Sequence, residues 1–220
     1  YTGDVRLWLC PERRAADFRS VQRNPRMQKE PAEKTGASRL RRIVCGEERT
    51  IDERRMRMRV IIHDLGAEYE ASWKAKCDRL IHADGKYAGC RGCFGCWTKH
   101  PAECFMRDDL QDICRIVGRA DELIIITENY YGTYSPFVKA VLDRSIGLST
   151  PLSTYRGGQM HHTLRYGAHK IIKVYVYGNI PEQERTTFEQ IAKRNAINYG
   201  YGASQVVFVR RPEQLAGVME

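Results

Sequence analysis

Four closely spaced cysteines are the residues of this chain whose types and spacing most clearly suggest chemistry. Cys90, Cys93 and Cys96 form a C-x2-C-x2-C run with glycines between them, and Cys104 follows eight residues later. A short glycine-rich loop can turn several sulfur atoms toward one point. Clustered thiolates suit a [4Fe–4S] cluster, a zinc ion or redox-active thiols.

The spacing favours the cluster among these three. Structural zinc sites usually take two separated pairs of ligands, because four tetrahedral ligands need two chain crossings. This chain has one compact run and one following cysteine, as in iron–sulfur ligation. Zinc, metal-free redox thiols and inert buried cysteines remain open alternatives.

A second candidate site is a turn that carries aromatic and hydroxyl side chains. It comprises Asn129, Tyr130, Tyr131, Gly132, Thr133, Tyr134 and Ser135 and follows an apolar run. Such a turn can present a π face and backbone N–H groups to a flat, partly polar ring. A second turn, Tyr177, Gly178 and Asn179, follows a later apolar run. The alternative is that these tyrosines only cover the edge of a sheet.

The elements that must position these residues alternate between strands and helices. Apolar, β-branched runs predict buried parallel strands, and Ser135-Pro136 predicts a helix start with proline at its first position. Asp108 three residues before Gln111 predicts a capping box. The expected strands are 58–63, 79–83, 122–127, 170–177 and 204–209, and the expected helices are 68–76, 109–117, 136–146 and 181–199. This order predicts an α/β fold, a five-stranded parallel sheet with helices on both faces, and a ligand beyond the carboxyl ends of the strands.

The first quarter of the chain differs in composition from the rest. Residues 1–57 hold 15 Lys/Arg and 9 Asp/Glu and show no sustained period, whereas residues 58–220 hold 21 and 18. Such a segment buries too little apolar area to offset its ordering entropy. We expect residues 1–57 to be a basic, disordered extension that need not be native, and residues 58–220 to be one domain.

Composition restricts the class of protein. The chain has 220 residues, a formal charge of +9 and eight cysteines, and no apolar run of membrane-spanning length. The positive excess is concentrated in the first quarter, where charges are mixed and few aromatics interleave, so nucleic-acid binding is disfavoured. The cysteine pattern and the lack of a signal segment lead us to expect a reducing, cytoplasmic location and no membrane partner.

Taken in order, these motifs resemble the flavodoxin-like NAD(P)H-dependent FMN reductases, particularly their iron–sulfur flavoprotein branch. That family has the cysteine run, a further cysteine before two aspartates, an apolar strand, an aromatic loop and a K-x-x-x-D-R helix. Here these are Cys90/Cys93/Cys96, Cys104 with Asp108-Asp109, strand 123–127, loop 129–135, and Lys139 with Asp143-Arg144. The resemblance implies a flavodoxin-like three-layer sandwich.

The resemblance also implies cofactors and partners. The 129–135 loop would hold the isoalloxazine ring of FMN, and Tyr177–Asn179 would flank its other side. The four cysteines would carry a cluster near this flavin or near that of a partner subunit, because the family commonly forms homodimers. NAD(P)H would donate hydride, and the protein would supply stacking and hydrogen bonds.

One turn departs from the family pattern. Where the family has hydroxyl side chains around the FMN phosphate, this chain has His63-Asp64-Leu-Gly-Ala-Glu68. Carboxylates beside a phosphate are unfavourable. His63 and the N–H groups at the start of the following helix are the remaining candidates for phosphate binding.

His162 is the candidate catalytic residue. The His161-His162 segment could lie over the flavin as a lid and supply a proton, or it could be a solvated polar turn.

These inferences favour an FMN-dependent oxidoreductase that passes electrons from NAD(P)H to a small acceptor such as a quinone, nitro compound, flavin or metal ion. A one-electron carrier between proteins and a metal- or redox-sensing module without flavin are the alternatives.

Overall fold

The computed structural model describes residues 5–9, 57–156, 158–167 and 169–217. Their strands are β1 (Val5–Leu9), β2 (Arg59–His63), β3 (Arg79–His82), β4 (Glu122–Glu128), β5 (Ser149–Arg156), β6 (Gln159–Leu164), β7 (His169–Tyr177) and β8 (Tyr201–Val209). The α-helices are α1 (Glu70–Lys74), α2 (Gly95–Thr98), α3 (Ile113–Arg119), α4 (Pro136–Arg144) and α5 (Glu182–Tyr199). Short 3-10 turns are η1 (Ala67–Tyr69), η2 (Ser145–Leu148) and η3 (Pro212–Gly217).

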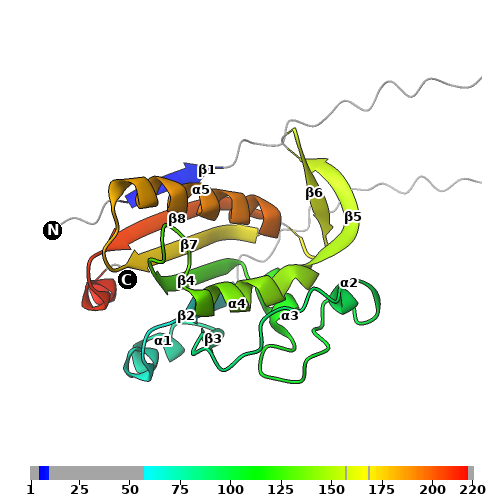
Figure 1. Ribbon diagram of the computed structural model, residues 1–220, viewed down its shortest axis with the longest axis horizontal. Coiled ribbons are helices and arrows are strands. Elements are labelled where there is room, and N and C mark those ends of the chain that lie inside the picture. Colours follow the sequence, from blue (N-terminus) through cyan, green and yellow to red (C-terminus); the bar gives the residue numbers. More distant parts are fainter. Residues whose placement is uncertain (1–4, 10–56, 157, 168, 218–220) are drawn as a thin grey trace, which may run out of the picture. The chain divides into compact units, whose positions relative to one another are not determined.

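The main sheet has the order β1-β8-β7-β4-β2-β3 (Figure 1). Strands β3, β2, β4, β7 and β8 pair in parallel, which confirms the predicted five-stranded parallel sheet and the flavodoxin-like fold class. Because β3 lies on one side of β2 and β4 on the other, the strand order reverses at the β2/β4 pair. In open α/β sheets, ligands bind at such a switch point, beyond the carboxyl ends of the strands.

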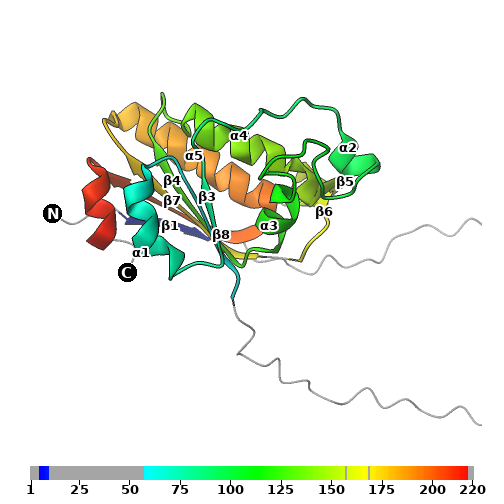
Figure 2. The ribbon, with the colours of Figure 1, turned by 90° about the horizontal axis from the view of Figure 1, so that it is seen from below.

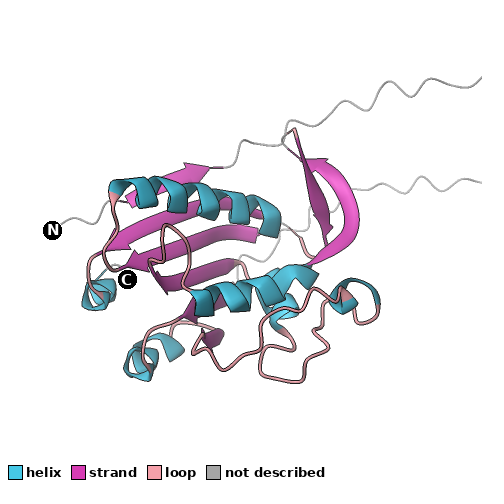
Figure 3. Cartoon of the chain, viewed as in Figure 1, coloured by secondary structure: helices cyan, strands magenta, loops and turns pink. Residues whose placement is uncertain are grey.

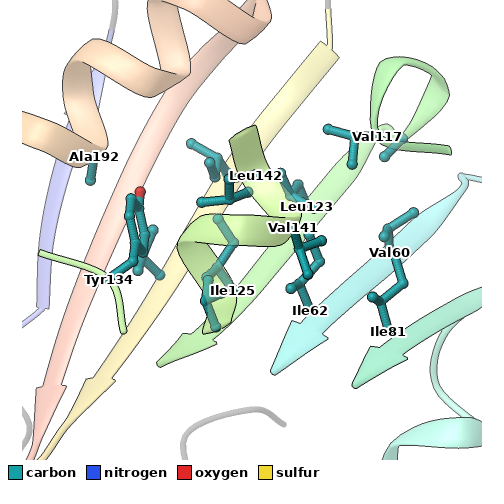
Figure 4. Close-up of a cluster of buried hydrophobic side chains, with 14 of the residues drawn as sticks. Val60, Ile62, Ile81, Val117, Leu123, Ile125, Tyr134, Val141, Leu142 and Ala192 are labelled. Carbon is teal, nitrogen blue, oxygen red and sulfur yellow. The ribbon is translucent and has the colours of Figure 1, made fainter. Parts of the chain in front are cut away.

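Helices cover both faces of the sheet (Figures 2 and 3). Alternate residues of each central strand face opposite layers, as the period of two requires. On one face, Val60, Ile62, Leu123 and Ile125 join a cluster that contains residues of α3, α4 and α5 (Figure 4). On the other, Ile61, Ile124 and Ile126 pack with Trp73 of α1 and Leu215 of η3. Each such fully buried aliphatic side chain contributes roughly 1.5–3 kcal/mol.

The sheet also contains a strand from the predicted extension. Val5–Leu9 pairs with β8 in an antiparallel arrangement, so at these five residues the structure departs from the expected disorder of residues 1–57. Residues 10–56 lie outside the described part, and the expectation for them stays a prediction. No helix among the described residues is long and apolar enough to cross a membrane.

Two local predictions differ from the structure. The capping box at Asp108 does not start a helix: α3 begins only at Ile113, and Asp112 caps it without a side-chain bond. The Asp108 carboxylate accepts from the Leu110 N–H at 3.1 Å, but residues 109–112 form turns, and the same carboxylate is held by Arg144. The polar segment after α4 is a two-stranded β5–β6 hairpin that the sequence interpretation missed. Its signal was the Gly157-Gly158 pair, which favours tight hairpin turns.

Candidate functional site

The turn after β4 is a tight reversal at the carboxyl end of the sheet. The backbone N–H groups of Tyr130 and Thr133 each donate to the other residue's carbonyl, at 3.0 and 3.1 Å. Tyr131 (φ 53°) and Gly132 (φ 78°) are both left-handed, as a type I′ turn requires. A Cβ at Gly132 would lie 3.2 Å from the carbonyl oxygen of Glu184, so the turn packs directly on α5.

Asn129 fixes this turn to the neighbouring elements. Its backbone N–H donates to the Tyr177 carbonyl at 2.9 Å, and its side-chain amide donates to the Asn179 carbonyl at 3.0 Å and to the Glu184 carboxylate. Its side-chain oxygen accepts from the Gly132 N–H at 3.2 Å. The two turns that the sequence predicted to flank a ring are therefore side by side.

The tyrosines of the turn divide into two groups. Tyr130 and Tyr131 are 50 % and 80 % exposed, and their rings meet edge to face at 5.0 Å. Tyr134 is buried against Phe188, and its hydroxyl accepts a hydrogen bond from the Asn195 amide. Burial raises the pKa of Tyr134. Tyr130 and Tyr131 can meet a ligand, whereas the Tyr134 side chain belongs to the core.

Ser135 has a structural role that the sequence predicted. Its hydroxyl accepts from the Val138 N–H at 3.3 Å and caps α4, with Pro136 in the first turn. Thr127 supports the same corner, because its hydroxyl accepts from the Ser135 N–H at 2.9 Å.

Asp64 occupies the switch point between β2 and β4. One of its carboxylate oxygens accepts from the Glu128 N–H at 3.0 Å and from the Thr127 hydroxyl at 3.3 Å. The other accepts from the Tyr177 hydroxyl at 3.1 Å. Burial and the Asp64 carboxylate raise the pKa of Tyr177. Asp64 therefore joins three strand ends, a role that the sequence analysis did not assign to it.

His63, predicted to contact a phosphate, is fully buried at the end of β2. Its ring stacks on His82 at 4.8 Å and meets Trp73 edge to face at 5.2 Å. Neither ring nitrogen has a hydrogen-bond partner of normal geometry. Burial, with the nearby His82, lowers the pKa of His63 and favours its neutral form.

The cysteine loop lies near the C-terminal end of α4, whereas the 129–135 turn precedes the N-terminal end of that helix. Cys90, Cys93, Cys96 and Cys104 line one cavity of about 40 Å³, together with Arg144, Ile146 and the half-exposed Phe94 and Phe105. Within the described residues, no group of three or more His, Cys, Asp or Glu side chains converges closely enough to hold a metal ion. The predicted ligands therefore share a cavity, but their sulfur atoms are not gathered at one point.

Two features of this cavity were not predicted. Arg144 ends α4, yet its side chain is fully buried and forms a two-pronged ion pair with Asp108. Arg144 lowers the pKa of that carboxyl group. Cys114 contacts Cys96, and a hydrogen bond between the two side chains lowers the pKa of Cys96 to about 7. A Cβ at Gly147 would lie 2.8 Å from the Cys114 sulfur, so glycine makes room for this contact.

His162 also lies at the cysteine end of the molecule. Its ring lies 4.7 Å from the ring of Trp97 of α2, tilted by 48°, and the indole N–H of Trp97 donates to the Ile146 carbonyl at 3.1 Å. Figure 1 shows the hairpin and α2 at the amino ends of the parallel strands, away from the 129–135 turn. The sequence interpretation offered His162 as a lid over the ring or as part of a solvated turn, and it placed the cysteines near this flavin or near that of a partner subunit. Within one chain, both lie away from the ring-binding turn (Figure 1). The physical reason is that α4 separates them, since nine residues of helix span roughly 13 Å.

Comparison with known families supports the flavin interpretation. Residues 74–161 match the family described as NADPH-dependent FMN reductase, which is less than half of the chain. The match confirms the predicted resemblance and the enzyme class, NAD(P)H-dependent flavin oxidoreductase, that it implies. It includes the cysteine loop and the 129–135 turn but not Asp64.

Solved structures with a similar fold include several flavoproteins. An NADH:FMN oxidoreductase in its apo form is 17 % identical, with 72 % of this chain and 79 % of that chain covered and a TM-score of 0.39. An FMN-dependent NADH-azoreductase from Bacillus anthracis in complex with FMN is 12 % identical, with 74 % and 93 % covered and a TM-score of 0.46. An NAD(P)H:quinone oxidoreductase from Methanothermobacter marburgensis is 13 % identical, with 70 % and 85 % covered and a TM-score of 0.41. No curated protein matches the chain.

Proposed function

We propose that this chain is a flavin-dependent oxidoreductase that takes electrons from NAD(P)H and passes them to a small acceptor such as a quinone, nitro compound, free flavin or metal ion. The observation that carries the proposal is the position of the exposed Tyr130–Tyr131 turn. It lies at the carboxyl rim of a flavodoxin-like sheet, within the stretch that matches the FMN reductase family.

The residues of the rim fit the ring portion of a flavin. Tyr130 and Tyr131 offer two exposed aromatic faces, and Asn129 holds the turn against the 177–179 turn. Stacking on such side chains orients a planar ring and excludes water from one of its faces. A bound flavin would supply the hydride chemistry, accepting two electrons from a nicotinamide and releasing them to the acceptor.

Flavin titration of the purified full chain tests this proposal. Quenching of flavin fluorescence should saturate, and NAD(P)H oxidation should depend on both flavin and a quinone. Tyr131→Ala should weaken flavin binding by about tenfold, because a stacked ring contributes roughly 1–1.5 kcal/mol. Tyr155→Ala is the matched control, since Tyr155 is 77 % exposed on the hairpin at the other end. A protein that binds no flavin would refute the proposal and favour the sensing module.

The cysteine cavity supports a second part of the proposal, a [4Fe–4S] cluster that divides electron pairs into single electrons. Four cysteines, the number of thiolates that such a cluster takes, line one cavity. Binding would require the loop to draw its sulfurs together. Because the cavity lies at the other end of α4 from the rim, such a cluster would serve the flavin of a second subunit in a homodimer. A carrier of single electrons would use the same parts.

Metal analysis of protein purified without oxygen tests the cluster. Under this proposal, iron and acid-labile sulfide are present, and Cys93→Ser abolishes both while flavin affinity is unchanged. Cys77→Ser, outside the cavity, should leave both unchanged. Zinc in place of iron, or no metal at all, would reject the cluster and leave the flavin proposal standing.

A further inference from the structure

The first turn of the domain is built to accept hydrogen bonds. At the switch point, the Asp64 carboxylate already accepts from the Glu128 N–H and the Tyr177 hydroxyl, and it shares the Thr127 hydroxyl with the Glu128 carbonyl. A phosphate group is also purely an acceptor at neutral pH when it is fully ionised. Asp64 and a phosphate would therefore compete for the same donors.

The charges around this turn are negative. Residues 64–70 contain Asp64, Glu68 and Glu70 and no lysine or arginine, and Glu70 is paired with Lys74 at 2.9 Å, so the repulsion comes from Asp64 and Glu68. The Glu68 carboxylate folds back over Gly66, where a Cβ would lie 2.2 Å from its oxygen. Carboxylates at the position of a phosphate repel it.

Of the two compensating features expected from the sequence, His63 is not available to a ligand, and the start of the following helix is short. His63 is enclosed between His82 and Trp73, and burial lowers its pKa, so it offers no cation. The helical segment that follows is one 3-10 turn and five α-helical residues, and aligned peptide dipoles this few give a weak positive end.

The same geometry suits an uncharged polyol. A carboxylate held at a strand end is a strong acceptor for hydroxyl donors, and charge-assisted hydrogen bonds of this kind are among the stronger ones. The ribityl chain that links an isoalloxazine ring to its terminal group carries such hydroxyls. With the ring on the Tyr130–Tyr131 turn, Asp64 lies at the next strand end along the sheet, where the chain of the ligand would continue.

We propose that the rim recognises the ring and ribityl chain of a flavin but has no phosphate subsite. Riboflavin then binds at least as tightly as FMN. This inference rests on the proposed flavin-dependent function and specifies its ligand class.

Parallel titrations of the full chain with riboflavin and FMN test the inference, with quenching of flavin fluorescence as the measurement. We expect the dissociation constant of riboflavin to be equal to or below that of FMN. Raising the salt concentration should narrow any difference, because ions screen the repulsion between carboxylate and phosphate. This second measurement needs no variant.

Asp64→Asn removes the charge at nearly constant shape. It should tighten FMN binding by about three- to tenfold and leave riboflavin binding unchanged or weaker. Asp109→Asn is the charge-matched control, because Asp109 is exposed and follows the cysteine loop, away from the rim. Should Asp64→Asn fail to fold by circular dichroism, Glu68→Gln tests the same repulsion on an exposed side chain.

The outcomes separate the two proposals. Binding of FMN tenfold or more tighter than riboflavin would overturn the inference and leave the flavin function standing. An Asp64→Asn protein that folds with an unchanged ratio of the two affinities would overturn it as well. Failure of the wild-type chain to bind either flavin would refute the proposed function itself.

Discussion

Carboxylates have different roles at the two ends of α4. At the carboxyl rim, Asp64 is an acceptor shared among neutral donors, and the aromatic residues Tyr130 and Tyr131 remain exposed. At the amino ends of the strands, where α4 ends, Asp108 is paired with the fully buried Arg144 beside a cavity lined by cysteines. The rim leaves aromatic surface exposed for a ligand, whereas the charged groups at the amino ends of the strands stabilise the fold. A carboxylate therefore cannot be assigned a role from its type alone.

The largest expected effect is the loss of stability on breaking the buried Arg144–Asp108 ion pair, compared with breaking an exposed pair on the same helix. Arg144→Ala should lower the free energy of unfolding by about 3–5 kcal/mol, because it leaves Asp108 without its partner in a partly buried position. Lys139→Ala breaks the exposed Lys139–Asp143 pair and should cost below about 0.5 kcal/mol. Urea denaturation followed by circular dichroism measures both. Equal losses of unfolding free energy would show that burial does not strengthen the Arg144–Asp108 pair.

The next effect comes from alanine substitution at two glycines with nearly equal φ angles. Gly132 in the rim turn has φ +78° and Gly158 in the hairpin has φ +77°. Alanine at either position costs about 1 kcal/mol of backbone strain. At Gly132 the new Cβ also lies 3.2 Å from Glu184, whereas it meets nothing within 4 Å at Gly158. Gly132→Ala should therefore be the more destabilising in thermal denaturation and should also weaken flavin binding. Indistinguishable variants would mean that the turn is not packed on α5.

The smallest effect concerns pH and the buried His63. Its pKa is lowered in the folded protein, so the unfolded chain binds the proton more readily. Stability is therefore unaffected above the ordinary histidine pKa of about 6.5 and falls as the pH drops below it, by at most about 1.4 kcal/mol per pH unit.

In His63→Phe this contribution is absent. The difference in unfolding free energy between wild type and variant should be constant between pH 7 and 8. Between pH 6.5 and 5, the wild type should lose stability relative to the variant. A pH-independent difference would show that His63 titrates alike in both states.

Much of the architecture could be predicted from local pattern. The β-branched runs predicted all five parallel strands, and Ser135-Pro136 predicted the start of α4 with its cap. These features depend on neighbours within a few residues, which is why a single sequence reveals them. The cysteine motif and the aromatic turn were also found, because their spacing is local.

Long-range geometry was decided by the fold. The predicted helix start at Asp108 was wrong, since α3 begins at Ile113, and the main partner of the Asp108 carboxylate is Arg144, 36 residues away along the chain. The fold also places Cys114 against Cys96 beside η2, which lowers the pKa of the Cys96 thiol. Strand β1 pairs with β8 from the far end of the sequence. No periodicity encodes such partners.

The sequence by itself determined which elements form, which residues carry sulfur or aromatic chemistry, and the class of fold that holds them. The tertiary structure decided which of these residues meet. It placed the ring-binding turn and the cysteine loop at opposite ends of α4, and it set Asp64 at the switch point. The reason is physical: side-chain type and spacing are properties of the local chain, whereas proximity between distant segments depends on how the sheet orders its strands and where each connection returns.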